Sequence, residues 1–162
     1  MAEPVDPVEP LWMLAARAAE ARAAPMPLPE FWRHVAALGW SVARHTPEPC
    51  GALLAERLTV AQVAAMRLRL RLLESELAAR IEQWTLRDEE SLDLPVDLQA
   101  ALREHLVGLG EAAYTAALKG PWRAKHCADR DDYLEGFGRC FDAAYARFPA
   151  SALEQALADL AP

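Results

Sequence analysis

The chain has 162 residues, a formal net charge of −7, a hydrophobic content of 53% and 25% charged residues. This length fits one globular domain with a substantial core, and the composition excludes a disordered chain. The acidic balance argues against nucleic acid and anionic membrane surfaces as partners, and favours a basic protein or peptide. The sequence has no long uncharged apolar stretch and no signal-peptide pattern, so we expect neither membrane spanning nor export.

Three cysteines, Cys50, Cys127 and Cys140, are an odd number and form no CxxC pair. This pattern argues against a disulfide framework and favours a reducing compartment. We therefore expect a cytoplasmic protein.

Residues 1–10 contain three prolines and three acidic residues. We expect them to form a flexible, proline-rich acidic tail, followed by a single helical domain over 11–162. Alanine and leucine dominate that domain, and no strand-like alternation of apolar and polar residues occurs in it. The sequence therefore predicts an all-α protein.

The first half of the chain predicts three helices, over 11–23, 30–44 and 50–58. The second of them has apolar residues at helical spacing, including Val42 near its end. Pro29 suits the first turn of that helix, and prolines separate each helix from the next.

A long helix is predicted to begin at Thr59. Thr59 and Gln62 have the spacing of a capping box, in which each side chain bonds the backbone N–H of the other. The apolar stripe that follows steps by three or four residues: Val63, Met66, Leu70, Leu73, Leu77, Ile81 and Trp84. Arg67 and Arg71 share one side of this helix, where we expect solvated flanks of a core helix and no nucleic-acid site.

A second long helix is predicted from Asp97 to Lys119, with His105 on its apolar stripe and Gly108 and Gly110 near its middle. Two further helices are expected, one after an N-cap at Asp129 and one near the C-terminus. The predicted architecture is an irregular bundle of six or seven helices around two long antiparallel helices, those that begin at Thr59 and Asp97.

The usual signatures of chemistry are missing from the sequence. There are no Glu-x-x-His pairs of a di-iron bundle and no zinc-ligand spacing, so no metal is predicted. There is also no GxSxG, GxGxxG or Walker sequence. We therefore assign no catalytic residue and no cofactor, and we leave open whether the protein is an enzyme.

Six residues are candidates for binding: Trp32, Trp40, Asp97, Arg103, His105 and Tyr114. His105 is interpreted first as a buried imidazole bonded to a carbonyl or carboxylate, and second as a site residue. Trp32 and Trp40 lie off the main apolar stripes and could line a cleft or an interface. The Arg103 guanidinium could bind a carboxylate in a bidentate manner, and this carboxylate could belong to the protein itself, to a ligand or to a partner.

Glycine in a helix interior costs about 1 kcal/mol relative to alanine, so Gly108 and Gly110 need a reason. We predict that both allow a neighbouring helix or aromatic ring to approach closely. Alternatively, they shape the wall of a pocket.

One spaced set of residues is similar to the central motif of the DUF4240-like family of small bacterial helical domains, whose function is unknown. The set is Asp97, Arg103, Val107, Gly110, Tyr114, Leu118 and Pro121. The match spans about residues 30–148 and also includes Phe31–Trp32. The resemblance implies an all-helical bacterial domain and draws attention to Asp97, Arg103 and Tyr114.

Two functional hypotheses follow. The first is a non-enzymatic helical binding or accessory module for a protein or peptide partner, as in toxin neutralisation by an immunity protein. The second is a small-molecule-binding protein or an enzyme, with a pocket between helices around Arg103, His105 and Tyr114. A closed pocket at these residues would favour the second hypothesis, and a solid core beside an exposed tryptophan patch the first.

Overall fold

The computed structural model describes residues 8–85, 96–119 and 136–159, without the side chains of 81–85 and 96–98. These residues form helices and no strand, which confirms the predicted all-α class. The helices are α1 (Leu11–Arg22), α2 (Leu28–Leu38), α3 (Pro47–Arg57), α4 (Val60–Thr85), α5 (Val96–Gly108), α6 (Glu111–Lys119), α8 (Arg139–Arg147) and α9 (Ala150–Ala158). The predicted N-cap at Asp129 and most of the predicted tail lie outside the described residues.

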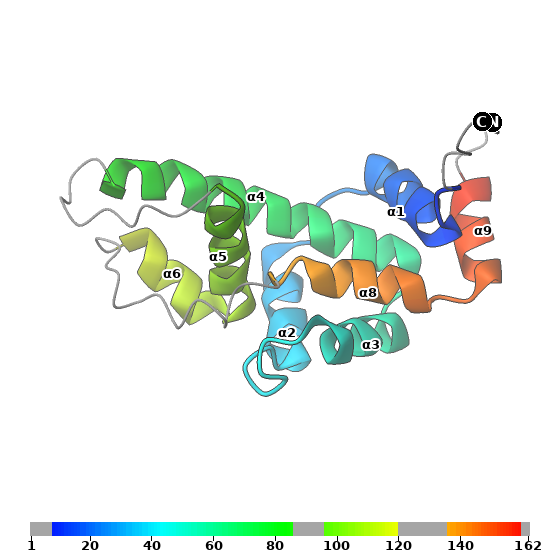
Figure 1. The fold of residues 1–162 in the computed structure, drawn as a ribbon, viewed down its shortest axis with the longest axis horizontal. Coiled ribbons are helices and arrows are strands. Elements are labelled where there is room, and N and C mark those ends of the chain that lie inside the picture. The colour runs from blue at the N-terminus through cyan, green and yellow to red at the C-terminus, as the bar shows by residue number, and fades with distance from the viewer. Residues whose placement is uncertain (1–7, 86–95, 120–135, 160–162) are drawn as a thin grey trace, which may run out of the picture.

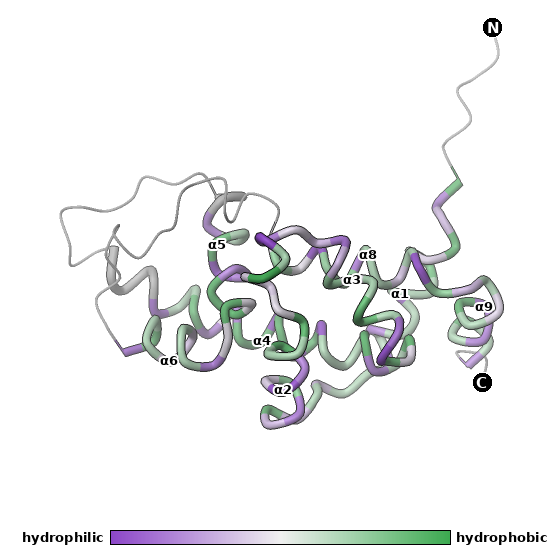
Figure 2. Tube along the Cα trace, turned by 90° about the horizontal axis from the view of Figure 1, so that it is seen from below, coloured by the Kyte–Doolittle hydropathy of each residue, from purple (hydrophilic) through white to green (hydrophobic). Residues whose placement is uncertain are grey.

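Helix α4 runs along the length of the molecule and joins its two ends (Figure 1). The N-terminal helix α1 and the C-terminal helix α9 lie at one end, and α5 and α6 lie at the other. Helices α2, α3 and α8 lie between them. A second view keeps α9 and α6 at opposite ends (Figure 2). The first and last helices of the described chain therefore form one end layer of the bundle.

Helix α4 begins as the sequence predicts. The backbone N–H of Thr59 donates to Oε1 of Gln62 at 2.9 Å, and the N–H of Gln62 donates to Oγ1 of Thr59 at 3.2 Å. This reciprocal pair satisfies two N–H groups that a helix start leaves open. The part of the apolar stripe whose side chains are described is buried: Val63, Met66, Leu70, Leu73 and Leu77.

The second long helix was predicted as one continuous element from Asp97 to Lys119, and this prediction is wrong. The chain forms α5 up to Gly108 and starts α6 at Glu111. Gly110 lies between them with φ +116°, a conformation that side chains with a Cβ rarely adopt. The N–H of Gly110 donates to the carbonyl of Val107 and ends α5, while the carbonyl of Gly110 accepts from Tyr114 and starts α6. Gly110 is therefore a turn residue.

Helix α2 is also shorter than predicted, because it ends at Leu38 and Gly39 follows in the left-handed conformation at φ +61°. Val42, predicted on its apolar face, lies outside the helix and is exposed. Helix α3 in turn begins three residues earlier than predicted, at Pro47. A proline in the first turn loses no intrahelical hydrogen bond, so it fits there.

Candidate functional site

His105 is buried at 2% exposure, as its first interpretation predicted, but the partner that the structure identifies is an indole. The Nε1–H of Trp40 donates to Nδ1 of His105 at 3.0 Å. Because Nδ1 accepts this bond, the ring is a neutral imidazole whose proton is on Nε2. An Nε2 that carries a proton is neither a metal ligand nor a general base, so this arrangement favours a structural role for His105.

The surroundings of this pair are aromatic and tightly packed. The ring of His45 lies 4.6 Å from that of His105 and nearly perpendicular to it, and Phe137 lies 5.3 Å from Trp40 between ring centroids. His45 and Arg44 both have positive φ, which is uncommon for residues with a side chain. Trp40 is 1% exposed, so its indole belongs to the core and presents no face to solvent.

Gly108 makes this packing possible, which confirms the predicted close approach of an aromatic ring. A Cβ at Gly108 would lie 2.7 Å from the Phe137 ring and 3.0 Å from Trp40. The same prediction is wrong for Gly110, where a Cβ would meet no atom within 4 Å. The two glycines therefore serve different purposes, one in packing and one in backbone conformation.

Tyr114 and Trp32 meet at a second place, between α6 and α2. Their ring centroids are 5.4 Å apart, and the Tyr114 hydroxyl donates to Oε2 of Glu76 on α4 at 2.6 Å. Burial raises the pKa of Tyr114, and the neighbouring Glu76 carboxylate raises it further. The hydroxyl therefore stays protonated and links α6 to α4.

Arg103 lies at a third place and faces α4. Its NH2 group is 3.6 Å from Oε1 of Glu74, so the internal ion pair that the sequence left as one alternative is present. The Nε atom of Arg103 is buried and makes no hydrogen bond. Burial raises the pKa of Glu74, and the Arg103 guanidinium partly offsets that rise. The side chain of Asp97 lies outside the described residues.

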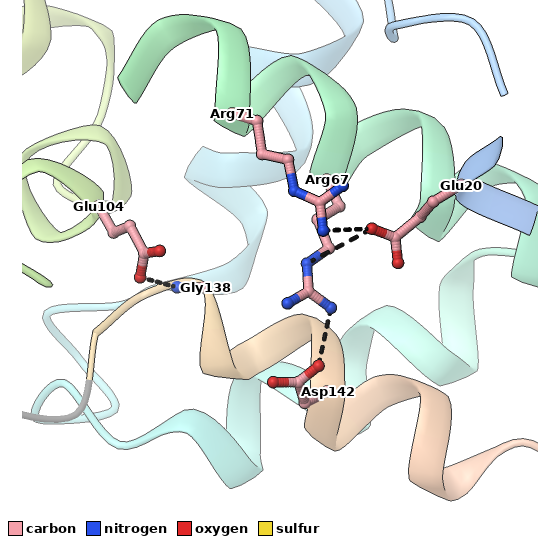
Figure 3. A network of polar contacts seen from close by, with 6 residues as sticks. All are labelled: Glu20, Arg67, Arg71, Glu104, Gly138 and Asp142. Carbon is pink, nitrogen blue, oxygen red and sulfur yellow. Dashed lines mark hydrogen bonds and ion pairs between the residues drawn. The ribbon is translucent and has the colours of Figure 1, made fainter. Parts of the chain in front are cut away.

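A cluster of charges that the sequence did not predict joins α1, α4 and α8 (Figure 3). Oε1 of Glu20 on α1 lies 2.7 Å from Arg71 and 3.7 Å from Arg67, and Arg67 also binds Oδ1 of Asp142 on α8 at 2.7 Å. The Glu20 side chain is only 9% exposed. Arg67 is therefore not a solvated flank but a bridge between three helices.

The buried phenol of Tyr145 lies beside this cluster. Burial raises the pKa of Tyr145, and the negative charge of Glu20 raises it further. A cavity of about 510 Å³ opens next to the cluster, with Trp12 and Met13 on its apolar wall. Its charged lining contains three basic and three acidic residues, namely Arg17, Arg67, Arg71, Glu9, Glu20 and Asp142. The charges balance, so the cavity favours neither an anion nor a cation.

A larger hollow of about 850 Å³ lies between α1, α4 and α9, and we call it the end groove. Its lining is mainly apolar and rich in alanine: Ala19, Ala23, Ala24, Leu58, Val60, Ala61, Ala65, Phe148, Pro149, Ala152 and Ala156. Polar groups enter its lining at Arg22, Thr59, Gln155 and Asp159. None of the six predicted binding residues lines the end groove or the cavity beside the charge cluster.

Small side chains are the reason for the end groove. Alanine on α1, α4 and α9 keeps each helix helical, yet it leaves the space between them unfilled. The predicted site residues are large apolar, aromatic or charged side chains, and none of them lies in this region. The signal that could have found it is the run of alanines in 15–24 together with those at Ala61, Ala65, Ala152 and Ala156.

Two of the three cysteines, Cys50 and Cys140, lie within the described residues. Cys50 and Cys140 are free and fully buried on α3 and α8, and Sγ of Cys50 donates to the carbonyl of Leu38 at 3.5 Å. The neighbouring Cys50 thiol and burial raise the pKa of Cys140, whereas the neighbouring Cys140 thiol lowers the pKa of Cys50. Because both sulfur atoms are fully buried, neither thiol is accessible to a reagent in the folded protein.

Within the described part of the chain, no group of three or more His, Cys, Asp or Glu side chains is placed to hold a metal ion. No described helix combines the length and the apolar character that crossing a membrane requires.

Comparison with known proteins finds no matching family model, no matching curated protein and no matching solved structure. The resemblance to the DUF4240-like family stays a prediction.

Proposed function

We propose that this chain is a non-enzymatic binding module that receives an amphipathic helix of a partner protein in the end groove. The observation that carries this proposal is the apolar lining of a hollow of about 850 Å³ between three helices. Helix-in-groove recognition needs such an apolar trough, into which the partner lays residues spaced by three or four along its sequence.

The alanines of the end groove favour a helix as the occupant. Small side chains on α1, α4 and α9 let another backbone approach closely, and the partner supplies the bulky apolar side chains that fill the space. Arg22, Thr59, Gln155 and Asp159 provide polar groups for the edge of such an interface. A trough with apolar walls and few polar groups suits helix packing better than bond-making chemistry.

The charge of the chain favours a basic partner. Arg22 and Asp159 cancel at the groove itself, but the whole chain carries a net charge of −7. Such a field accelerates the approach of a cationic partner and disfavours acidic competitors. The proposed occupant is therefore a helix with leucine-like residues on one face and lysine or arginine on the other.

The alternative pocket around Arg103, His105 and Tyr114 receives less support. Arg103 pairs with Glu74, His105 bonds Trp40, and Tyr114 bonds Glu76. These three contacts tie the proposed site residues to three different internal partners.

A model peptide tests the proposal. We suggest a labelled 14-residue peptide of leucine and lysine with all leucines on one helical face, followed by fluorescence anisotropy. Binding to the wild-type chain is expected, and a leucine–glutamate peptide of the same pattern is expected to bind more weakly. If neither peptide binds, the proposed function is wrong.

A matched pair of variants locates the binding. Ala61 is exposed and lines the end groove, so Ala61→Trp should fill it and weaken binding at least tenfold, about 1.4 kcal/mol. Ala79→Trp is the control, because Ala79 is exposed on the same helix, five full turns away and on the same side. Equal loss, or no loss, in the two variants would contradict docking in the groove.

A further inference from the structure

Large apolar side chains anchor α1 only weakly. The side chains that α1 buries fully are Ala15, Ala16 and Ala18. Of its larger residues, Leu11 and Trp12 pack partly buried against the core, whereas Met13 and Leu14 are 39% and 38% exposed. Because hydrophobic stabilisation follows the apolar area removed from water, an alanine contact surface holds a helix less firmly than a leucine one.

Both sides of α1 also face open space. Ala19, Arg22 and Ala23 line the end groove, and Trp12, Met13 and Ala16 line the smaller cavity beside the charge cluster. Helix α1 contacts α4, α8 and α9, but the parts of its surface that face the two hollows lack the dense packing that makes most of a protein interior rigid. Helix α1 therefore separates the end groove from the cavity beside the charge cluster.

Ion pairs compensate for the weak apolar anchoring of α1. Glu20, near the end of α1, is paired with Arg67 and Arg71, which lie one turn apart on α4. The Glu20 side chain is 91% shielded from solvent by the body of the protein, where an ion pair is screened less than on the surface. Removing one partner of a buried pair leaves a charge without compensation.

The chain that follows α1 is fixed at Met26. Its N–H donates to the carbonyl of Ala65 at 3.0 Å, its own carbonyl accepts from Nε of Arg69 at 2.7 Å, and its side chain is buried. The segment 23–25 between α1 and Met26 is thus a short joint. Movement of α1 about that joint would leave Met26 fixed to α4.

We propose that α1 is a latched wall of the end groove: it opens about residues 23–25 while α3, α4 and α8 stay folded, and the ion pairs of Glu20 hold it closed. This inference rests on the proposed function, since it concerns access to the same groove. Opening joins the two hollows and admits a bulkier helix than the closed groove accepts. Helix α9 packs mainly against α1, so it loosens in the same movement.

Hydrogen exchange of the protein alone tests the latch, without any peptide. In the wild type, the amides of α1 and α9 should exchange at least about tenfold faster than those of α3 and α8, because local opening needs less free energy than global unfolding. Glu20→Gln keeps the shape and removes the charge, so it should accelerate exchange in α1 and α9 by a further factor of about ten and leave α3 and α8 unchanged. Glu56→Gln, at an exposed position on α3, is the control and should change neither.

Uniform protection of α1, α3, α8 and α9 in the wild type would overturn the latch. The same conclusion follows if Glu20→Gln accelerates exchange everywhere to the same degree, since the cluster would then support the whole fold. If Glu20→Gln does not fold, Arg71→Met, which removes an exposed partner of Glu20, takes its place with the same expected pattern.

The two proposals fail separately. Peptide binding with a uniformly protected α1 would leave the proposed function intact and describe a rigid groove. A mobile α1 without peptide binding would support the latch and contradict the proposed occupant.

Discussion

The indole N–H of Trp40 hydrogen-bonds Nδ1 of His105 across 65 residues of sequence, with both side chains almost completely buried. This bond joins the loop after α2 to α5 and fixes the tautomer of the imidazole. Gly108, one turn after His105, leaves room for the Phe137 ring against the same indole. The most suggestive histidine of the sequence is therefore part of the core.

Replacing Trp40 with Phe removes the donor and keeps most of the apolar volume. His105 Nδ1 is then a buried acceptor without this bond, so the free energy of unfolding should fall by about 1–3 kcal/mol beyond the packing loss. Urea unfolding followed by circular dichroism measures the change. Trp32→Phe, a change of the same chemistry at a half-buried residue, should cost less; an equal or larger cost would contradict the role given to the Trp40 bond.

Gly108→Ala should destabilise the protein because its Cβ would meet Phe137 at 2.7 Å. Overpacking of this kind costs about 1–3 kcal/mol. Gly110→Ala should also destabilise, by about 1 kcal/mol or more, through backbone strain at φ +116° and with no steric clash. Thermal unfolding of the two variants checks both expectations, and a Gly110→Ala protein as stable as the wild type would exclude the turn as the reason for that glycine.

Glu104 predicts a specific pH dependence. Its Oε2 accepts from the N–H of Gly138 at 2.9 Å, and burial raises the pKa of Glu104 more than this bond lowers it. The folded state therefore binds the proton more tightly than the unfolded state, so this residue lowers stability as pH rises through the raised pKa. Glu104→Gln keeps an acceptor and removes the charge, so the stability of the variant relative to wild type should grow from about pH 4 to pH 7.

Urea unfolding of both proteins over that pH range measures this difference. A difference that stays constant, or that shrinks toward pH 7, would show that the carboxylate of Glu104 carries no desolvation penalty. Glu56→Gln, which changes an exposed carboxylate, should give no such trend.

Cys50 and Cys140 should be inert in the native protein. Both are buried, and the raised pKa of Cys140 keeps its thiol protonated. In a Cys127→Ser variant, Cys50 and Cys140 are the only remaining cysteines. An aromatic disulfide reagent, whose thiol product is coloured, should not react with this variant until denaturant unfolds the chain. Rapid labelling of either cysteine under native conditions would mean that the contact between α3 and α8 opens.

The apolar periodicity and the capping pair together were enough to predict α4. The apolar stripe from Val63 to Leu77 and the capping pair Thr59 and Gln62 each depend only on residues within a turn or two of the same helix. They can therefore be recognised whatever the rest of the chain does. The break at Gly110 was missed because a glycine inside a helical pattern fits two causes, a close contact or a positive φ. The pattern of neighbouring residues does not distinguish them.

The sequence does not predict the charge cluster, and its runs of alanine indicate where the end groove lies without giving its shape. Glu20 and Asp142 meet at Arg67 although they lie 47 and 75 residues from it along the chain, so only the tertiary packing of α1, α4 and α8 brings them together. The end groove is lined mainly by alanines, whose small side chains do not produce a clear amphipathic pattern in the sequence. Composition predicts that alanine-rich segments are helical, but it does not predict what space they leave between them.

The most direct test of the central claim is a nuclear magnetic resonance titration with the leucine–lysine peptide. If the partner helix docks in the end groove, the backbone signals that shift first and furthest should be those of Ala19, Ala61, Ala65, Ala152 and Ala156, on three different helices. The signals of α6, at the far end of the molecule, should stay in place (Figure 1). Shifts centred on α6, or spread evenly over the acidic surface, would contradict the account.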